Sequence, residues 1–392
     1  MQLSVETIQF IHTHSHDDVR LLALQAKKYP QVDMAEAVVQ IAGKQIAEAK
    51  LPTWAQTENI WYPRHLSMEQ CSSEVTALYK ASLVSGRSFV DLTGGFGIDC
   101  SYMAQSFAEA DYVERQEALC ELAVHNFSVL GRKINVHHQD GVEYLRKMES
   151  VDCIFLDPAR RDGHGGKTVA ISDCEPNVEE LEDLLVSKAA SVWVKLSPML
   201  DLSLALKTLS FIREVHIVSV NNECKELLLL LQKKETGPVR IHCEHITSQH
   251  KHQHESFTFQ EEKVAEVVTA TQVKRYLYEP NSSLLKAGAY RLLTSRYPVE
   301  KLHVNSHLYT SDERIDDFPG RIFTVQDYSG FAKKELKTLL QDVERANLTI
   351  RNFPSSVAEL RKRLKIKEGG SVYLFATTLA DDQKVLIKCI KG

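Results

Sequence analysis

The fold is decided by one short stretch, Phe89–Asp99, which reads FVDLTGGFGID. An apolar run ends at Asp91, and three glycines then fall within four positions. The apolar run is typical of a buried strand, and the glycines allow a tight turn in which backbone approaches a ligand without an intervening β-carbon. Ligands of open α/β sheets bind at such carboxyl strand ends. We therefore expect Asp91, Gly95 and Gly97 to hold a cofactor.

The sequence around this turn alternates short apolar runs with segments of helical length, up to about residue 246. Strands are expected at 88–92, 110–114, 134–138, 151–157, 191–196 and 215–220. Strands that alternate with helices predict a mostly parallel sheet covered on both faces. The apolar run 226–232 is ambiguous by periodicity, but the turn after it favours a hairpin with residues 238–246.

The two ends of the chain follow other patterns. The first 85 residues read as helical, whereas the C-terminal piece reads strand, helix, strand, helix, strand, strand. A capping box from Ser356 to Glu359 begins the second of these helices. This order predicts a small α+β domain, one sheet backed by two helices. The expected boundaries are 1–61 for the helical region, 62–260 for the parallel-sheet domain, 261–319 for a connecting segment and 320–392 for the C-terminal domain.

Composition narrows the class of protein. The chain has 392 residues, of which 43% are hydrophobic and 25% charged, so it is long enough for two or three domains. Its eight cysteines include no CxxC pair and are expected to be reduced thiols. The N-terminus lacks the pattern of a secretory leader, and no apolar run approaches the length of a membrane span. We expect a cytoplasmic protein with no membrane partner.

Charge is unevenly distributed along the chain. The formal net charge is -5, yet the segment from Arg321 onward carries 14 Lys and Arg against 8 Asp and Glu. The helix expected after Ser356 supplies a row of cations: Arg361, Lys362, Arg363, Lys365 and Lys367. A basic surface of this kind can contact nucleic-acid phosphates, and an ordinary solvated face is the equally weighted alternative.

Acidic residues recur where the following strands end. Glu114 ends the second strand, where a carboxylate can accept from both ribose hydroxyls of a nucleoside. Asp140 follows the third strand and is placed to accept from an adenine amino group, and Asp157 ends the fourth strand. Each residue alone is a weak signal, but their order along the sheet is specific. The pattern predicts an adenosine-containing cofactor.

Two cofactor classes fit a glycine loop of this type. A dinucleotide would rest its pyrophosphate on the loop, but Asp91 would repel it and Cys100 replaces the third glycine of the usual fingerprint. A carboxylate in the loop instead attracts an ammonium and a sulfonium group. This balance favours a nucleoside that carries an amino-acid tail over a dinucleotide.

Four motifs, DLTGGFG, VER, QDG and LDPAR, together resemble motifs I to IV of the class I S-adenosylmethionine-dependent methyltransferases. More narrowly, the whole chain resembles a bacterial group of methyltransferases with a THUMP-like, ferredoxin-like C-terminal domain. The resemblance implies a Rossmann-like seven-stranded sheet with reversed late strands, S-adenosylmethionine as cofactor, and RNA as the partner of the C-terminal domain. The expected cofactor-binding residues are Asp91, Thr93, Gly95, Gly97, Glu114, Asp140, Gly141 and Asp157.

The fourth motif carries the expected acceptor site. Relatives that methylate exocyclic base nitrogens have an Asp/Asn-Pro-Pro-aromatic sequence, from which Asp157-Pro158-Ala159-Arg160 departs at its last two positions. No cysteine follows the fifth strand, which disfavours covalent attack on a pyrimidine. We assign catalytic roles to Asp157, Pro158 and Arg160. Arg161 and Lys195 are expected either to hold a phosphate or base edge, or to form surface ion pairs.

The predicted function is N-methylation of a base in rRNA or tRNA. Two alternatives remain open from the sequence: a non-catalytic RNA-binding protein that retains the cofactor fold, and an NAD-dependent oxidoreductase. A histidine-rich segment matches no closed zinc pattern, so no metal is expected there. Its histidines are His242, His245, His250, His252 and His254.

Overall fold

The structure is a computed structural model that describes residues 3–160, 171–233, 237–249 and 251–392. The chain divides into two compact units, which are described separately. The first comprises Met1–Glu214 and Leu227–Gly237, and the second comprises Val215–Glu226 and Pro238–Gly392.

The expected Rossmann-like sheet is confirmed, with more strands than the seven predicted. Within the described residues, nine strands follow one another in the order β11-β10-β8-β9-β7-β4-β1-β2-β3. The strands are β1 (Gly86–Asp91), β2 (Phe107–Glu114), β3 (Asn135–His138), β4 (Val151–Leu156), β7 (Ala189–Leu196), β8 (Ile212–Val220), β9 (Glu223–Leu231), β10 (Arg240–Ile246) and β11 (His252–Thr258). Strand β10 corresponds to the strand expected at residues 238–246, whereas β11, which pairs antiparallel with it, was not expected.

The parallel part of the sheet belongs to the first unit. Strands β3, β2, β1, β4 and β7 run parallel, and β9 pairs antiparallel with β7. The last four residues of β4, Cys153–Leu156, are all buried, as expected for a strand covered on both faces. Helices follow the strands: α7 (Ile98–Met103), α8 (Glu117–Val129), α9 (Gly141–Lys147), α10 (Val178–Lys188) and α11 (Leu202–Thr208). Because these strands run parallel, their carboxyl ends meet at one edge of the sheet.

The expected hairpin between residues 226–232 and 238–246 is wrong. Strand β9 lies between β8 and β7, whereas β10 lies between β8 and β11. The turn that pairs β8 with β9 is made by Asn221 and Asn222, whose φ angles are 51° and 65°. A two-residue hairpin turn requires positive φ at both positions, and asparagine tolerates this conformation well. The Asn221-Asn222 pair therefore marks the hairpin in which β9 takes part, whereas the turn at Gly237 does not.

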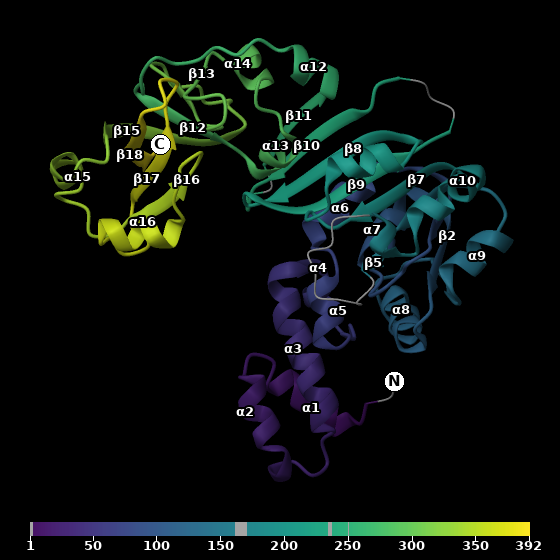
Figure 1. Cartoon of the computed structure of the whole chain (residues 1–392). Coiled ribbons are helices and arrows are strands. Elements are labelled where there is room, and N and C mark those ends of the chain that lie inside the picture. The colour runs from purple at the N-terminus through teal and green to yellow at the C-terminus, as the bar shows by residue number, and fades with distance from the viewer. Residues whose placement is uncertain (1–2, 161–170, 234–236, 250) are drawn as a thin grey trace. The chain divides into compact units, whose positions relative to one another are not determined.

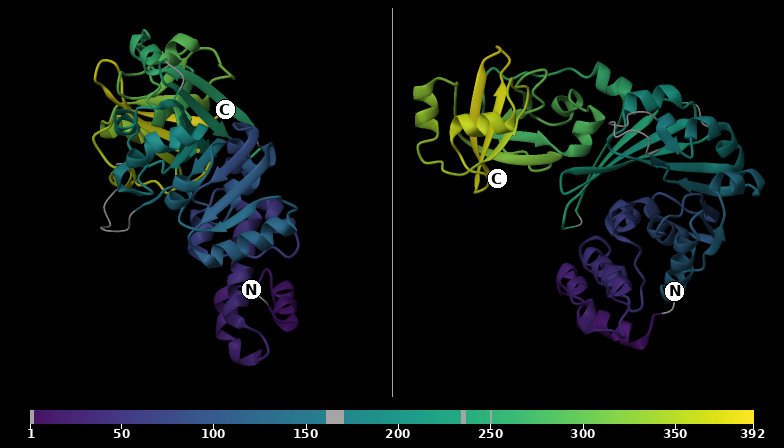
Figure 2. Two further views of the ribbon diagram at one scale, coloured as in Figure 1. Left: turned by 90° about the vertical axis from the view of Figure 1, so that its right-hand side faces the viewer. Right: turned by 60° about the horizontal axis from the view of Figure 1, so that its bottom comes forward.

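Helices fill the N-terminal region, as expected. They are α1 (Val5–Thr13), α2 (Val19–Leu24), α3 (Met34–Lys50), α4 (Pro52–Gln56), α5 (His65–Gln70) and α6 (Glu74–Ser82), the purple and blue helices of Figures 1 and 2. Trp54, Tyr62 and Met68 from this region share one apolar core with Phe96 and Tyr102. The N-terminal helices are thereby packed directly against the glycine loop and α7.

The second unit contains a separate seven-stranded sheet, in the order β13-β14-β12-β15-β18-β17-β16 among the described residues. Its strands are β12 (Tyr276–Pro280), β13 (Glu300–Lys301), β14 (Tyr309–Ser311), β15 (Gly320–Ser329), β16 (Asn347–Ile350), β17 (Val372–Thr378) and β18 (Lys384–Lys391). Its helices are α12 (Phe259–Val264), α13 (Ser282–Ala287), α14 (Leu292–Arg296), α15 (Lys333–Leu339) and α16 (Val357–Leu364). The capping box from Ser356 to Glu359 is present at the start of α16.

The two faces of this second sheet are buried by different parts of the chain. Leu374 of β17 and Leu386 of β18 pack with Leu339 and Leu360 of the two C-terminal helices. Phe375, next to Leu374 and so on the other face, packs with residues of the segment before β15. Those residues are Ala270, Val273, Leu277, Leu302 and Leu308. The segment expected only to connect two domains thus supplies three strands and half of this core.

Candidate functional site

The glycine loop after β1 is built by backbone hydrogen bonds. The N–H of Gly94 donates to Val113 O at 2.9 Å, and the N–H of Gly97 donates to Gly94 O at 2.8 Å. Gly95 and Gly97 have φ angles of 54° and 82°, which glycine adopts without strain. A β-carbon on Gly95 would meet only Thr93 O, at 3.8 Å. The loop therefore has free space beside Gly95.

Asp91 lies at the end of β1 and is 1% exposed. Its Oδ1 accepts the backbone N–H of Thr93 at 3.0 Å. Burial raises the pKa of this carboxyl well above its ordinary value, and the charges of Asp99, Asp157 and Glu114 raise it further. Four carboxylates thus converge here, and in the described part of the chain no lysine or arginine forms an ion pair with Asp91.

Glu114, at the end of β2, is tied to the loop. Its Oε2 accepts the N–H of Gly95 at 3.0 Å, and its Oε1 accepts the N–H of Gln116 at 2.8 Å. The side chain is therefore held at the strand tip, as the sequence suggested. A carboxylate has about four acceptor positions, so capacity for two further donors remains.

Asp140 caps the helix that follows β3. Its Oδ1 accepts the N–H groups of Val142 and Glu143, at 2.9 and 3.0 Å, and the residue is exposed. The adjacent Gly141 is required sterically, because a β-carbon there would lie 2.1 Å from Leu92 O. This contact brings the start of α9 against the end of β1, and so places Asp140 beside the glycine loop.

Asp157 follows β4, the strand next to β1. Its backbone N–H donates to Thr93 Oγ1 at 2.6 Å, so Thr93 links the loop to the fourth motif. The side chain is 38% exposed, and Pro158 after it is buried. The backbone of Arg160 lies in the short strand β5 (Ala159–Arg160), but its side chain and all of Arg161 lie outside the described residues.

Lys195 forms no surface ion pair, because its side chain is only 11% exposed at the end of β7. Its Nζ lies 2.5 Å from Asp157 Oδ2 and 3.5 Å from Asp99 Oδ2. Burial alone would raise the pKa of Asp99, but the ammonium groups of Lys80 and Lys195 and the Ser72 hydroxyl together lower it.

Sequence reasoning missed three members of this cluster: Ser72, Lys80 and Asp99. Asp99 lies within the stretch that decided the fold, in the first turn of α7, but no spacing rule links it to a lysine 19 residues earlier. The sequence did carry one signal for Asp99: it lies in the first turn of a largely apolar helix, and a charged residue that is buried there requires a partner.

Histidine side chains gather on β10 and its neighbours in the second unit. The ring of His242 stacks on that of His216 with centroids 4.4 Å apart. Oε1 of Glu244 lies 2.5 Å from Nδ1 of His252, and its Oε2 lies 3.1 Å from Nδ1 of His254. Hydrogen bonding to a buried carboxylate accounts for these two histidines, while His250 lies outside the described residues.

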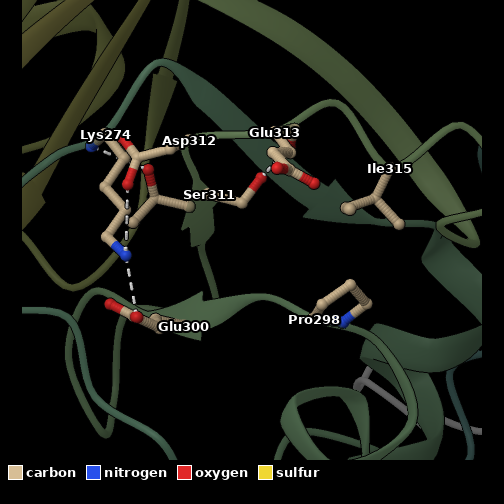
Figure 3. A pocket seen from close by; sticks show the side chains of 8 residues that line it. Lys274, Pro298, Glu300, Ser311, Asp312, Glu313 and Ile315 are labelled. Atoms are coloured by element: carbon tan, nitrogen blue, oxygen red, sulfur yellow. Dashed lines mark hydrogen bonds and ion pairs between the residues drawn. The ribbon is translucent and has the colours of Figure 1, made fainter.

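A cavity of about 220 Å³ opens in the second unit. Figure 3 shows Lys274 reaching toward Glu300, with Pro298 and Ile315 farther along the lining. Lys274 Nζ lies 2.8 Å from Glu300 Oε1 and 3.5 Å from Asp312 Oδ2, so the lysine is fully engaged by the lining.

The expected row of cations is only partly helical: α16 ends at Leu364, so Lys365 caps the helix and Lys367 lies beyond it. Lys362, Arg363, Lys365 and Lys367 are all exposed, whereas Arg361 is half-buried and donates to Ala346 O at 3.2 Å. Along the described residues, none of the helices combines the length and apolar character needed to cross a bilayer. All eight cysteines are free thiols, as expected.

Two family models match the C-terminal part of the chain. Residues 276–319 match a ferredoxin-like domain, and residues 320–391 match a THUMP domain-like family. No curated protein sequence is significantly similar to this chain.

Among solved structures, a crystal structure named "putative methyltransferase" from Porphyromonas gingivalis W83 is similar along nearly the whole length. It is 35% identical, covers 98% of this chain and 97% of its own, and superposes with a TM-score of 0.87. A Listeria monocytogenes protein assigned to the class I S-adenosylmethionine-dependent methyltransferases is 11% identical, covering 61% of this chain and 92% of its own with a TM-score of 0.37.

An rRNA methylase from Streptococcus thermophilus is 14% identical, covering 41% of this chain and 95% of its own with a TM-score of 0.31. At such scores the Listeria and Streptococcus likenesses carry no argument. The first likeness does, because it combines substantial identity with nearly complete coverage of both chains. Together with the four motifs and the C-terminal segments, it shows that the chain belongs to the class I S-adenosylmethionine-dependent methyltransferases with a THUMP-like C-terminal domain.

Proposed function

We propose that this methyltransferase binds S-adenosylmethionine at the strand tips around the glycine loop and methylates a base nitrogen of rRNA or tRNA. The observation that carries the proposal is the convergence of Asp91, Glu114 and Asp157 around a loop with free space at Gly95. When bound, S-adenosylmethionine supplies a methyl group activated by a sulfonium.

The residues at the loop fit this cofactor. Asp91 is a buried carboxylate without an ion-paired cation in the described part of the chain, and its ionised form would be favoured by a cationic ligand. Glu114 retains acceptor capacity for ribose hydroxyls, and Asp140, at the neighbouring strand end, has a second oxygen for an adenine amino group. We assign these three contacts, with backbone contacts at Gly95, Gly97 and Gly141, as the cofactor site.

Asp157 is the residue we assign to the methyl acceptor. Its carboxylate is partly exposed at the strand next to the loop, where it can accept a hydrogen bond from an exocyclic amine. An amine that gains a methyl group must lose one proton, and a carboxylate in this position can receive it and pass it to water. Pro158 fixes the turn that follows.

The assignment of RNA as substrate is supported by the C-terminal unit. The match to a THUMP-like family and the exposed cations of α16 both favour contact with phosphates of a structured RNA. Cations of this kind position a nucleic acid without reading its sequence. The particular RNA then depends on shape and on contacts made elsewhere.

Binding and transfer test the proposal separately. Calorimetry should detect S-adenosylhomocysteine and no NAD; binding of NAD alone would leave the oxidoreductase as the better reading. The purified protein should transfer labelled methyl groups from S-adenosylmethionine to RNA isolated from cells that lack it. Asp157→Ala should reduce this labelling by about 100-fold or more. Equal labelling by both proteins would remove Asp157 from its role, and no labelling by either would favour a binding protein.

A further inference from the structure

Two buried lysines meet at one carboxylate in the first unit. Lys80 Nζ of α6 lies 3.2 Å from Asp99 Oδ1, and Lys195 Nζ of β7 lies 3.5 Å from Asp99 Oδ2. Ser72 completes the cluster, because its hydroxyl donates to Asp99 Oδ2 at 2.7 Å and accepts from Lys80 at 3.2 Å. These three charged groups and Asp157 form one continuous chain of ion pairs.

One end of this chain of ion pairs is buried, and the other end is partly exposed to solvent. The side chain of Lys80 is 2% exposed, those of Asp99 and Lys195 are 10% and 11% exposed, and that of Asp157 is 38% exposed. A pair that served stability alone would gain nothing from such an opening. The only member that solvent, or a substrate, reaches freely is the carboxylate already assigned to the methyl acceptor.

Lys195 occupies one side of that carboxylate. Its Nζ lies 2.5 Å from Asp157 Oδ2, which leaves Oδ1 as the oxygen for an incoming amine. The same contact holds the carboxylate in one orientation, and its other oxygen can accept a hydrogen bond. Asp99 holds Lys195 from behind, and Asp99 belongs to the helix that begins at the glycine loop.

We propose that Lys195 is a positioning residue for methyl transfer: it fixes the orientation of Asp157, and Asp99 fixes Lys195 in turn. This inference rests on the proposed function, since it takes Asp157 as the acceptor-binding group. It assigns Lys195 no contact with RNA phosphate. Lys80 neutralises the other side of Asp99 and has no part in the transfer.

The structure offers a matched pair of substitutions. Lys195→Met and Lys80→Met each delete one buried lysine that pairs with Asp99, but only the first also contacts Asp157. Both variants should lose comparable thermal stability, because each leaves a buried carboxylate with one cation fewer. Their effects on Asp157 should differ.

The first readout is transfer of labelled methyl groups to RNA from cells that lack the protein. Lys195→Met should lower kcat by about tenfold or more, with the affinity for S-adenosylhomocysteine unchanged within about threefold. Lys195→Arg should restore most of the rate. Lys80→Met should keep kcat within about threefold of wild type.

The second readout needs no RNA. In protein labelled with carboxyl-¹³C aspartate, the Asp157 signal, assigned through Asp157→Asn, should change its chemical shift in Lys195→Met and keep it in Lys80→Met. If the two methionine variants give the same Asp157 signal, or lose activity only in step with stability, the inference is wrong. If the wild-type protein labels no RNA while the Asp157 signal changes as expected, the proposed function fails and the pairing of Lys195 with Asp157 stands.

Discussion

At the scale of single residues, the candidate site contains a carboxyl group whose ionised form lowers the stability of the folded protein when no ligand is bound. Asp91 is buried, and burial raises its pKa well above the ordinary value of an aspartate. A raised pKa means that ionising the group in the folded chain is unfavourable, so stability is present at low pH and is lost as pH rises. Functional groups often reduce stability in this way.

The substitution Asp91→Asn should separate these two effects. Asparagine keeps an oxygen for the N–H of Thr93 but removes the buried charge. We expect the melting temperature at neutral pH to rise and the affinity for S-adenosylhomocysteine to fall by about tenfold or more, since a charge-assisted hydrogen bond is lost. Thermal melting and calorimetry measure the two quantities. As a control, Asp183→Asn on the exposed side of α10 should change neither. Wild-type affinity in Asp91→Asn would contradict the cofactor assignment.

Lys301, in the second unit, is a buried cation, and burial disfavours its charged form as it does that of Asp91. It is 2% exposed, and burial, together with the charge of Arg291, lowers the pKa of its ammonium group to about 8, against a smaller raising effect of Glu262. Between pH 8 and 10.5 the unfolded chain holds this proton and the folded chain does not. Stability from this group is therefore present above pH 10.5 and is lost as pH falls toward 8.

Lys301→Met should remove this penalty. Although the bond from Lys301 Nζ to Val304 O is lost, we expect a net stabilisation of roughly 1–3 kcal/mol at pH 7. The difference from wild type should narrow as pH approaches 10.5. Denaturant unfolding at pH 7 and pH 10 measures it. A variant that is less stable than wild type at pH 7 would show that the ammonium group is better solvated than its burial indicates.

At the scale of elements, the approach of α9 to β1 depends on the absence of one side chain. A β-carbon on Gly141 would lie 2.1 Å from Leu92 O, a backbone atom that cannot rotate away. Gly141→Ala should therefore destabilise the protein by about 3 kcal/mol and weaken S-adenosylhomocysteine binding, because the strand tips must separate. Gly131→Ala is the control: no atom lies within 4 Å of its β-carbon, and only its φ of 66° adds strain of about 1 kcal/mol. Equal losses in the two variants would contradict this packing argument.

The cations on α16 provide a second prediction at this scale. Lys362→Ala combined with Lys365→Ala should weaken binding of structured RNA and reduce the dependence of log Kd on log salt by up to about 2. The charge-matched control is Lys27→Ala with Lys28→Ala, two exposed lysines of the N-terminal region. Filter binding at several salt concentrations measures both. Identical slopes for the two double variants would indicate that α16 is an ordinary solvated face.

Most of the elements could be predicted from periodicity, and the errors have specific physical causes. Strands β1 to β4 were placed within a few residues because their apolar runs are continuous and bounded by turns. The hairpin of β8 and β9 was missed because Asn221 and Asn222 were not weighed as a left-handed turn. The partners of Asp99 were not predictable, because Lys80 and Lys195 reach it only through the packing of α6 and β7.

At the scale of the whole molecule, the boundary near residue 320 separates two sequence families but not two cores. Strand β12 pairs with β15, and Leu277 and Leu308 pack with Phe323 and Phe375 across that boundary. A fragment 320–392 should therefore expose apolar side chains on one face of its sheet and lack a sharp melting transition. A fragment 268–392 keeps this core and should melt cooperatively. Circular dichroism and amide NMR spectra compare them. A well-dispersed spectrum from 320–392 alone would contradict this view.

The core that β12 shares with β15, β17 and β18 also bears on how such a chain could arise. A gene fusion that delivered only the final 73 residues to another catalytic domain would deliver half of a hydrophobic interior, with nothing to cover the rest. The transferable module is the pair of families together, and relatives that keep one should keep the other. In this protein, the unit that folds around one core is larger than either of the two sequence families that match it.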